Sequence, residues 1–250
     1  MKGKMRFLAV ALIALLMIWC SCEADGITKR YSSSKHAYHQ VQQFKPQNEL
    51  PTVITTESDD TKVGFVNEDI VRLKEQFSDA IGWLSVDNTI IDYPFVQAAD
   101  NDYYLHRNLE GDYLYPGSIF IDYRNYGDVT DSNTIFYGHN MKDESMFTSL
   151  KRFADKGFFD NNKQGKIYLS DKTLQITFFA YMYIVADDAV IYGMNDYHED
   201  AVRFLAYVRD NALYYREGDY TPQDRFVTLS TCVNATGAAR MVLIGKLYDN

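Results

Sequence analysis

The stretch Phe226–Cys232, with the sequence FVTLSTC, is the segment that most constrains how this chain can fold. Its branched and aromatic residues favour a β-strand. Side chains of a strand alternate between two faces, so Cys232 shares a face with Ser230, while Leu229 points the other way. A small polar loop follows, and Arg240 then opens a second apolar stretch. The pattern predicts two neighbouring strands whose ends bring a thiol and a guanidinium close together.

The distribution of cysteines adds a second constraint. Of the three cysteines, Cys20 and Cys22 lie in an N-terminal apolar run, so Cys232 is the only thiol in the rest of the sequence and has no disulfide partner there. A lone cysteine of this kind is a candidate nucleophile. The alternative is a small buried apolar residue, which is what most free cysteines are. The cysteines alone leave both interpretations open.

The N-terminus has features of an export signal and of a membrane anchor. Residues 1–6 carry three basic side chains and precede an apolar run over residues 7–22. The run is longer than a typical signal-peptide core and shorter than a typical spanning helix. We interpret it as an uncleaved anchor with residues 1–6 in the cytoplasm, because basic residues stay on that side; a cleaved signal is the alternative. The favoured interpretation predicts a single-pass cell-membrane protein whose folded domain is extracellular.

The remainder divides into a polar segment and one domain. Residues 23–62 lack clear periodicity, which is typical of a stalk, and residues 63–250 suffice for one substantial core. A net charge of −9 argues against nucleic acid as a partner. The 20 tyrosines and 15 phenylalanines favour a folded, largely β protein. Two stalk histidines, His36 and His39, have no accompanying cluster of ligand residues, so we predict no metal site.

Periodicity divides the domain into strands with a few helices between them. Helical spacing of apolar residues predicts helices over residues 67–82, 143–157 and 195–213. Strands are predicted over residues 89–96, 117–122, 133–140, 166–169, 174–185, 226–232 and 241–244. Because the helices do not alternate regularly with the strands, a mixed barrel or sandwich fits better than a doubly wound sheet.

A thiol needs a nearby base or cation to act as a nucleophile at neutral pH, since its unperturbed pKa is about 8.5. His139 is the best candidate base, because it follows a predicted strand and a glycine and can project into a cleft. His198 lies among acidic residues at a helix start and is interpreted as solvated, and His106 follows an aromatic pair and has a structural interpretation. The chain order, histidine before cysteine, disfavours a papain-like enzyme. Zinc-protease and serine-hydrolase motifs do not occur.

Several motifs together resemble class B sortases. Residues 228–232 are followed by an arginine on the next strand, and residues 137–141 read YGHNM, with Met-Phe at 146–147. Further similar segments are DYPFVQ at 92–97, NDYYL at 101–105 and GSIFIDYRN at 117–125. The resemblance covers the chain from about residue 67 to residue 250, and its motifs agree in order and spacing.

The resemblance implies a mainly β fold, an eight-stranded sortase-type barrel with an N-terminal helix and a long helix inserted before the cysteine strand. It also implies a cysteine transpeptidase without a cofactor or metal. Such an enzyme cleaves the C-terminal sorting signal of a secreted protein after its threonine and transfers the protein to an amine of a cell-wall peptidoglycan precursor.

The resemblance further implies roles for individual residues. Cys232 is the nucleophile, His139 the general acid and base, and Arg240 positions the substrate and stabilises the oxyanion. The family's substrate contacts map onto Asn101, Leu105, Tyr137 and Ser230.

The chain departs from the class in the loop after the cysteine. This loop is short, and Val233 and Asn234 stand where class B relatives often carry acids. A candidate carboxylate for orienting the histidine is therefore missing, and the preferred signal stays open. Two alternatives remain: a membrane-tethered thiol peptidase that hydrolyses its acyl-enzyme, and a non-catalytic surface binding protein in which Cys232 is structural.

Overall fold

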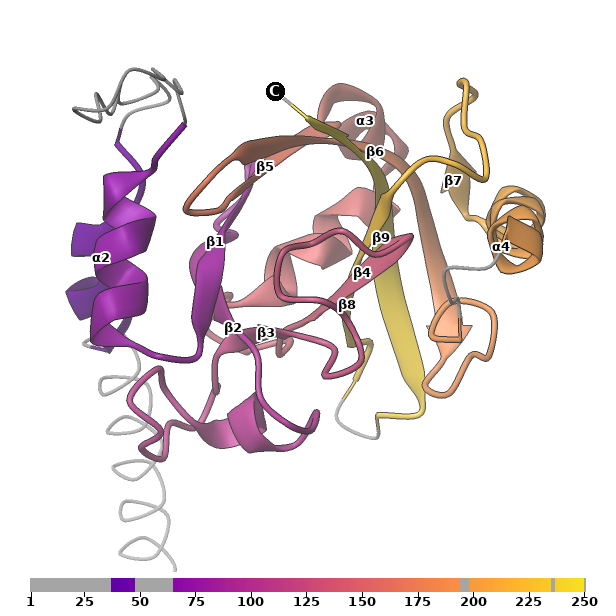
Figure 1. The fold of residues 1–250 in the computed structure, drawn as a ribbon. Helices are drawn as coiled ribbons and strands as arrows, with labels where there is room; N and C mark the ends of the chain where they lie inside the picture. The colour runs from indigo at the N-terminus through magenta and orange to yellow at the C-terminus, as the bar shows by residue number, and fades with distance from the viewer. Residues whose placement is uncertain (1–36, 48–64, 194–197, 235–236, 250) are drawn as a thin grey trace, which may run out of the picture.

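The strand pairing closes a barrel in the computed structural model, which describes residues 37–47, 65–193, 198–234 and 237–249. The strands are β1 (Ala80–Val86), β2 (Asp92–Val96), β3 (Ile119–Ile121), β4 (Asn133–Tyr137), β5 (Gln164–Tyr168), β6 (Thr173–Val185), β7 (Tyr214–Tyr215), β8 (Phe226–Cys232) and β9 (Ala239–Asp249). Their order is β5-β1-β2-β3-β4-β8-β9-β6, and β6 pairs back onto β5, so these eight strands form a closed ring (Figure 1). The short β7 pairs with β6 outside the ring.

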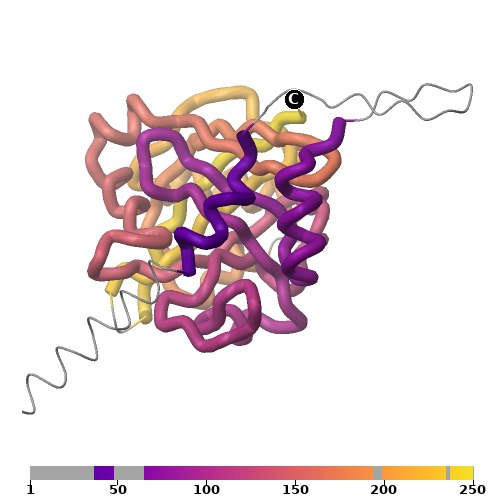
Figure 2. Tube along the Cα trace, turned by 90° about the vertical axis from the view of Figure 1, so that its left-hand side faces the viewer, coloured from indigo at the N-terminus to yellow at the C-terminus, as the bar shows by residue number. Residues whose placement is uncertain are grey.

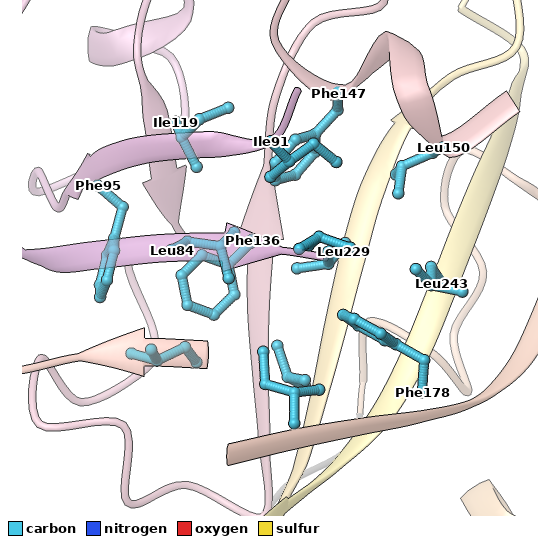
Figure 3. Packing of buried hydrophobic residues seen from close by; sticks show 14 of the residues in the cluster. Leu84, Ile91, Phe95, Ile119, Phe136, Phe147, Leu150, Phe178, Leu229 and Leu243 are labelled. Atoms are coloured by element: carbon cyan, nitrogen blue, oxygen red, sulfur yellow. The ribbon is translucent and has the colours of Figure 1, made fainter. Parts of the chain in front are cut away.

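The barrel interior is filled by apolar side chains from strands far apart in the sequence. Leu84 of β1, Phe95 of β2, Phe136 of β4, Leu229 of β8 and Leu243 of β9 are all fully buried in one cluster (Figure 3). Burying one such side chain contributes about 1.5–3 kcal/mol. This interior core holds the strands in fixed register and makes their ends a rigid platform.

The alternation along β8 follows the sequence prediction. Val227 and Leu229 belong to the interior cluster, whereas Phe226 belongs to a second cluster on the outer face of the barrel. Cys232 shares the parity of Phe226 and therefore lies on the outer face. The predicted strand over residues 226–232 is confirmed with the same bounds.

Helices pack around the barrel. They are η1 (Gln42–Phe44), α2 (Glu68–Gln76), η2 (Tyr103–His106), η3 (Phe147–Ala154), α3 (Lys156–Asn161) and α4 (His198–Asn211), where η denotes a 3₁₀ helix. Figure 1 shows α2 and α4 on opposite sides of the barrel. Phe204 and Val208 of α4 pack against β6, β8 and β9. The predicted fold class is confirmed, including the N-terminal helix and the long helix before the cysteine strand.

Residues 37–47 lie beside α2 on the same side of the barrel (Figure 2). Their buried side chains Val41 and Phe44 join Ile70 and Leu73 of α2 in a cluster over the outer face of β1. These residues fall within the segment predicted to be a polar stalk, 23–62, and their contacts attach this part of it to the domain. The other residues of the stalk lie outside the described residues.

Two predicted helices have the wrong bounds. The helix predicted over 67–82 ends at Gln76, and β1 begins at Ala80, because pairing with β2 satisfies the backbone there and overrides the continuing apolar spacing. The helix predicted over 143–157 is a 3₁₀ helix, η3, followed by a separate α3. The carboxylate of Asp155 accepts a hydrogen bond from the Phe158 amide at 2.7 Å and starts a new helix, so Gly157 lies inside α3 rather than ending a helix.

The predicted location as a single-pass membrane protein with an extracellular domain is wrong for the part of the chain that the structure describes. No helix there is long and apolar enough to cross a membrane. The longest, α4, has 14 residues, whereas a spanning helix needs about 20 apolar ones. The segment predicted as the anchor, residues 7–22, lies outside the described residues.

Candidate active site

Three neighbouring strands end at the same edge of the barrel and carry the candidate residues. β8 runs parallel to β4 and antiparallel to β9, which places Tyr137 opposite Ser230 and Cys232 opposite Arg240. The Cys232–Arg240 pair is the last of the β8–β9 ladder. The prediction that Cys232 and Arg240 lie near each other at the ends of neighbouring strands is confirmed.

His139 follows β4 by two residues and is held beside the cysteine strand by its own loop. At Gly138 a Cβ would lie 2.5 Å from Cδ1 of Ile119 and 2.8 Å from Cγ of Phe147, so only glycine lets the chain pass here. Asn140 donates through Nδ2 to the Cys232 carbonyl at 3.0 Å. This amide ties the histidine loop to the end of β8, a role that the sequence analysis did not assign to it.

The imidazole of His139 is half-buried and has one hydrogen bond to the backbone. Nε2 lies 2.8 Å from the carbonyl oxygen of Leu105, so Nε2–H donates, and in the neutral ring Nδ1 is the basic nitrogen. The ring stacks on that of His106, with centroids 5.2 Å apart and an angle of 20°. Burial lowers the pKa of His139 and the nearby His106 adds to this, while the Leu105 carbonyl opposes it. The neutral, basic form therefore prevails at neutral pH.

The thiol of Cys232 and the guanidinium of Arg240 are both able to bind a ligand. Cys232 is partly exposed and free of any disulfide. Arg240 donates through Nη1 to the carbonyls of Gly237 and Ala239. Within the described part of the chain no carboxylate forms an ion pair with Arg240, so no described group neutralises its positive charge.

A cavity of about 530 Å³, the catalytic cavity, opens at this edge of the barrel. All seven residues singled out from the sequence line it: Asn101, Leu105, Tyr137, His139, Ser230, Cys232 and Arg240. Leu105 contributes twice, because its carbonyl also holds His139. The structure thus brings together residues from four separate segments of the chain, while their individual roles stay predictions.

A buried carboxylate, Asp122, organises one wall of the catalytic cavity. Its side chain is 1% exposed and accepts hydrogen bonds from Nε and Nη2 of Arg124, both at 2.8 Å. Asn101 donates to it at 3.0 Å and the Tyr137 hydroxyl at 2.9 Å. Burial raises the pKa of this carboxyl, but the hydrogen bonds from Arg124, Asn101 and Tyr137 outweigh it and lower the pKa overall. Asp122 therefore stays ionised and fixes two of the predicted substrate contacts.

Tyr192 is a second residue of this cavity that the sequence analysis missed. It lies between β6 and α4, and its hydroxyl is 2.7 Å from the Ser230 hydroxyl. Its ring packs 6.1 Å from that of Tyr137. Burial raises the pKa of Tyr192 to about 12, so its phenol remains protonated. No local motif marks Tyr192, because only the return of the chain after β6 brings it over β8.

The set of polar residues suits thiol chemistry. Among the described residues no group of three or more histidines, cysteines or acids could hold a metal ion. What the cavity offers is a thiol, a neutral imidazole and an uncompensated guanidinium, which are the groups needed for nucleophilic attack on a carbonyl and for stabilising the resulting oxyanion.

Comparison with known proteins identifies the family. Residues 84–248 match the sortase domain. The chain belongs to the sortase family. Sortase B of Listeria monocytogenes (serovar 1/2a, strain EGD-e) is 36% identical over 203 residues, which cover 80% of this chain and 82% of that protein. This chain is therefore a sortase of class B, as the sequence motifs predicted.

Solved structures agree with this assignment. Sortase B from Bacillus anthracis, in complex with AAEK1, is 31% identical with a TM-score of 0.75, covering 89% of this chain and 100% of that one. Sortase B from Clostridium perfringens is 35% identical with a TM-score of 0.67, covering 72% of this chain and 99% of that one. Membership of this family indicates that the chain is a sortase transpeptidase and that its substrates carry sorting signals.

Proposed function

We propose that this sortase cleaves the C-terminal sorting signal of a secreted protein after its threonine, through a thioester on Cys232. The protein is then transferred to an amine of a cell-wall peptidoglycan precursor. The observation that carries the proposal is the shared catalytic cavity: Cys232 and Arg240 pair across β8 and β9, and Asn140 ties the His139 loop to the same strand end.

In the first half-reaction neutral His139 takes the proton of the Cys232 thiol, and the thiolate attacks the carbonyl carbon of the signal's threonine and forms a C–S bond. Arg240 donates hydrogen bonds to the oxyanion of the tetrahedral intermediate. The C–N bond then breaks, and His139 in its protonated form gives a proton to the departing amine. Asn101, Leu105, Tyr137 and Ser230 contact the signal peptide in this proposal.

In the second half-reaction the incoming amine attacks the thioester carbonyl. His139, now neutral, takes the proton of the attacking nitrogen as the C–N bond forms. The C–S bond breaks and Cys232 leaves as a thiolate. The lowered pKa of His139 supports the base role, because it keeps the imidazole neutral while the acyl-enzyme waits for the amine.

The direct test is mass spectrometry of the acyl-enzyme formed with a panel of sorting peptides. We expect a mass increase equal to the peptide fragment that ends in threonine, located on Cys232. In Cys232→Ala the adduct and peptide cleavage should both disappear. The double variant Cys20→Ala/Cys22→Ala is the matched control, because it removes the other two thiols and should retain the adduct. Cleavage that survives in Cys232→Ala would refute the nucleophile assignment.

Product analysis separates transfer from the alternative of a thiol peptidase. With an added amine, a transferase gives a product heavier by that amine, whereas a peptidase gives only the free carboxylic acid.

A further inference from the structure

A second cavity of about 350 Å³ lies next to the catalytic cavity, and we call it the side cavity. It is lined by Asp100, Asp102, Tyr103, His106, Arg107 and Tyr113. Most of these residues come from η2 and the residues just before it. None of the roles assigned above to the sorting-signal peptide uses this cavity.

The two cavities meet at the histidine. Asp102 lines both of them. His106 lines the side cavity, and its ring stacks against the ring of His139, which lines the catalytic cavity. His106 is fixed in turn, since its Nδ1–H donates to the Tyr115 carbonyl at 2.8 Å. A molecule in the side cavity would therefore border the catalytic cavity at Asp102 and at the His106–His139 stack.

The lining of the side cavity combines exposed aromatic rings with carboxylates. Tyr113 is 69% exposed and Tyr103 41% exposed, so neither ring serves mainly to fill a core. The guanidinium of Arg107 is engaged, because it lies 4.7 Å from the centre of the Tyr103 ring and donates to the Gly111 carbonyl. Aromatic faces together with carboxylates are the chemistry that recognises an ammonium group.

The carboxylate at the boundary is available for such a group. Within the described residues, nothing donates a hydrogen bond to the Asp102 carboxylate. The carboxylate of Asp100, in contrast, accepts from the amides of Asp102 and Tyr103 at 2.9 and 2.8 Å and thereby holds the start of η2. The backbone amide of Asp102 thus holds this residue at the junction of the two cavities, and its carboxylate can bind a ligand.

We propose that the side cavity binds the amine acceptor, a peptide that ends in a primary amine, with its ammonium group at Asp102 and its chain against Tyr103 and Tyr113. The inference rests on the proposed transpeptidase function and adds the second substrate site to it. A transpeptidase needs such a site, because the acyl group occupies the catalytic cavity when the acceptor arrives. When the acyl group and the acceptor are both bound beside His139, the amine does not have to reach the thioester by a bimolecular encounter, and the transfer is faster.

The proton balance fits this placement. The bound ammonium releases one proton to water, and the neutral amine attacks the thioester carbonyl. His139 takes the second proton from the nitrogen as the C–N bond forms, and the thiolate of Cys232 leaves. Water competes for the same thioester without needing the side cavity, so occupancy of this cavity determines the ratio of transfer to hydrolysis.

The test measures this ratio with the full chain, a sorting peptide that forms the acyl-enzyme, and triglycine as acceptor. We expect Tyr113→Ala to lower the ratio of triglycine product to hydrolysed product about fivefold, and Asp102→Asn about tenfold. Hydroxylamine, a small neutral nucleophile that needs no such site, captures the thioester in parallel. The ratio of hydroxylamine product to hydrolysed product should stay constant in both variants.

Tyr126→Ala is the matched control, because Tyr126 is 61% exposed but lines neither cavity, and its triglycine ratio should equal that of the parent chain. The proposal is overturned if triglycine and hydroxylamine ratios remain unchanged in both Tyr113→Ala and Asp102→Asn while the thioester forms normally. Absence of any thioester in the parent chain would instead refute the proposed function itself.

Discussion

Two arginines line the same catalytic cavity but are bonded differently. Arg124 donates through Nε and Nη2 to the buried carboxylate of Asp122, so its charge is paired within the protein. Arg240 donates only to backbone carbonyls of the described residues, and its charge stays available. The difference separates a group that shapes the cavity from one that can act on the substrate.

The contrast follows from where each side chain starts. Asp122 and Arg124 lie two residues apart in the loop after β3, and this proximity allows a paired, hydrogen-bonded geometry. Arg240 lies opposite Cys232 in the last pair of the β8–β9 ladder. A carboxylate beside it there would compete with the substrate for the guanidinium. The cavity thus has a rigid wall, where Asp122 and Arg124 neutralise each other, and a reactive edge, where Cys232 lies opposite Arg240.

The largest expected effect tests the reactive edge. Arg240→Lys removes the planar fork of donors, and we expect a loss in kcat of about 10²–10³-fold, because the oxyanion loses its directed hydrogen bonds. The thermal midpoint should change little. Steady-state kinetics with a cleavable signal peptide measures the first quantity, and thermal unfolding the second.

Arg124→Lys is the matched variant at the arginine that is paired with Asp122. It should change mainly KM and by about tenfold at most, since Arg124 acts through Asp122. If kcat fell as far in Arg124→Lys as in Arg240→Lys, the distinction between the two arginines would be lost.

The second prediction concerns the stability of the wall. Asp122→Asn leaves the half-buried donors Asn101 and Tyr137, and Arg124, without a charged acceptor, and we expect the free energy of unfolding to fall by about 2–3 kcal/mol at pH 7. KM for the signal peptide should rise, because Asn101 and Tyr137 lose their common acceptor. Chemical denaturation gives the stability, and Asp171→Asn, at an exposed turn, should stay within about 0.5 kcal/mol of the parent.

The pH dependence sharpens this prediction. The pKa of Asp122 is lowered in the folded protein, so its contribution is fully present above the unfolded value of about 3.9 and is lost as the pH falls through the folded value. The difference in stability between the parent and Asp122→Asn should therefore shrink in strongly acidic solution. A difference that stays constant from pH 7 to pH 2 would contradict an ionised Asp122.

The smallest effect concerns the histidine stack. The pKa of His139 is lowered from its ordinary value of 6.5, so the folded protein binds this proton less readily than the unfolded chain. Stability should accordingly decline as the pH falls through 6.5. His106→Gln removes one of the causes of the shift and should move the acidic limb of the acylation rate to higher pH. Stopped-flow acylation from pH 5 to pH 8 measures this, and a limb moved to lower pH would refute the coupling.

Local sequence determined the elements that carry the chemistry. Alternation from Phe226 to Cys232 gave the strand, its faces and its end at the thiol, because a half-buried strand imposes a period of two. The motifs around His139 and Arg240 pointed to their shared site, since strand ends and a glycine project side chains into clefts. The family, the barrel and the seven residues that line one cavity were within reach of sequence reasoning.

Tertiary structure decided the rest. Asp122 meets Asn101 and Tyr137 only when the barrel closes. The same holds for Tyr192 with Ser230 and for His106 with His139, and no local pattern marks which distant side chain each will meet. Apolar spacing likewise extended the first helix past Gln76, where pairing between β1 and β2 prevailed. Local patterns record the propensity and exposed face of each segment, whereas hydrogen bonds across long sequence separations depend on how the whole chain packs.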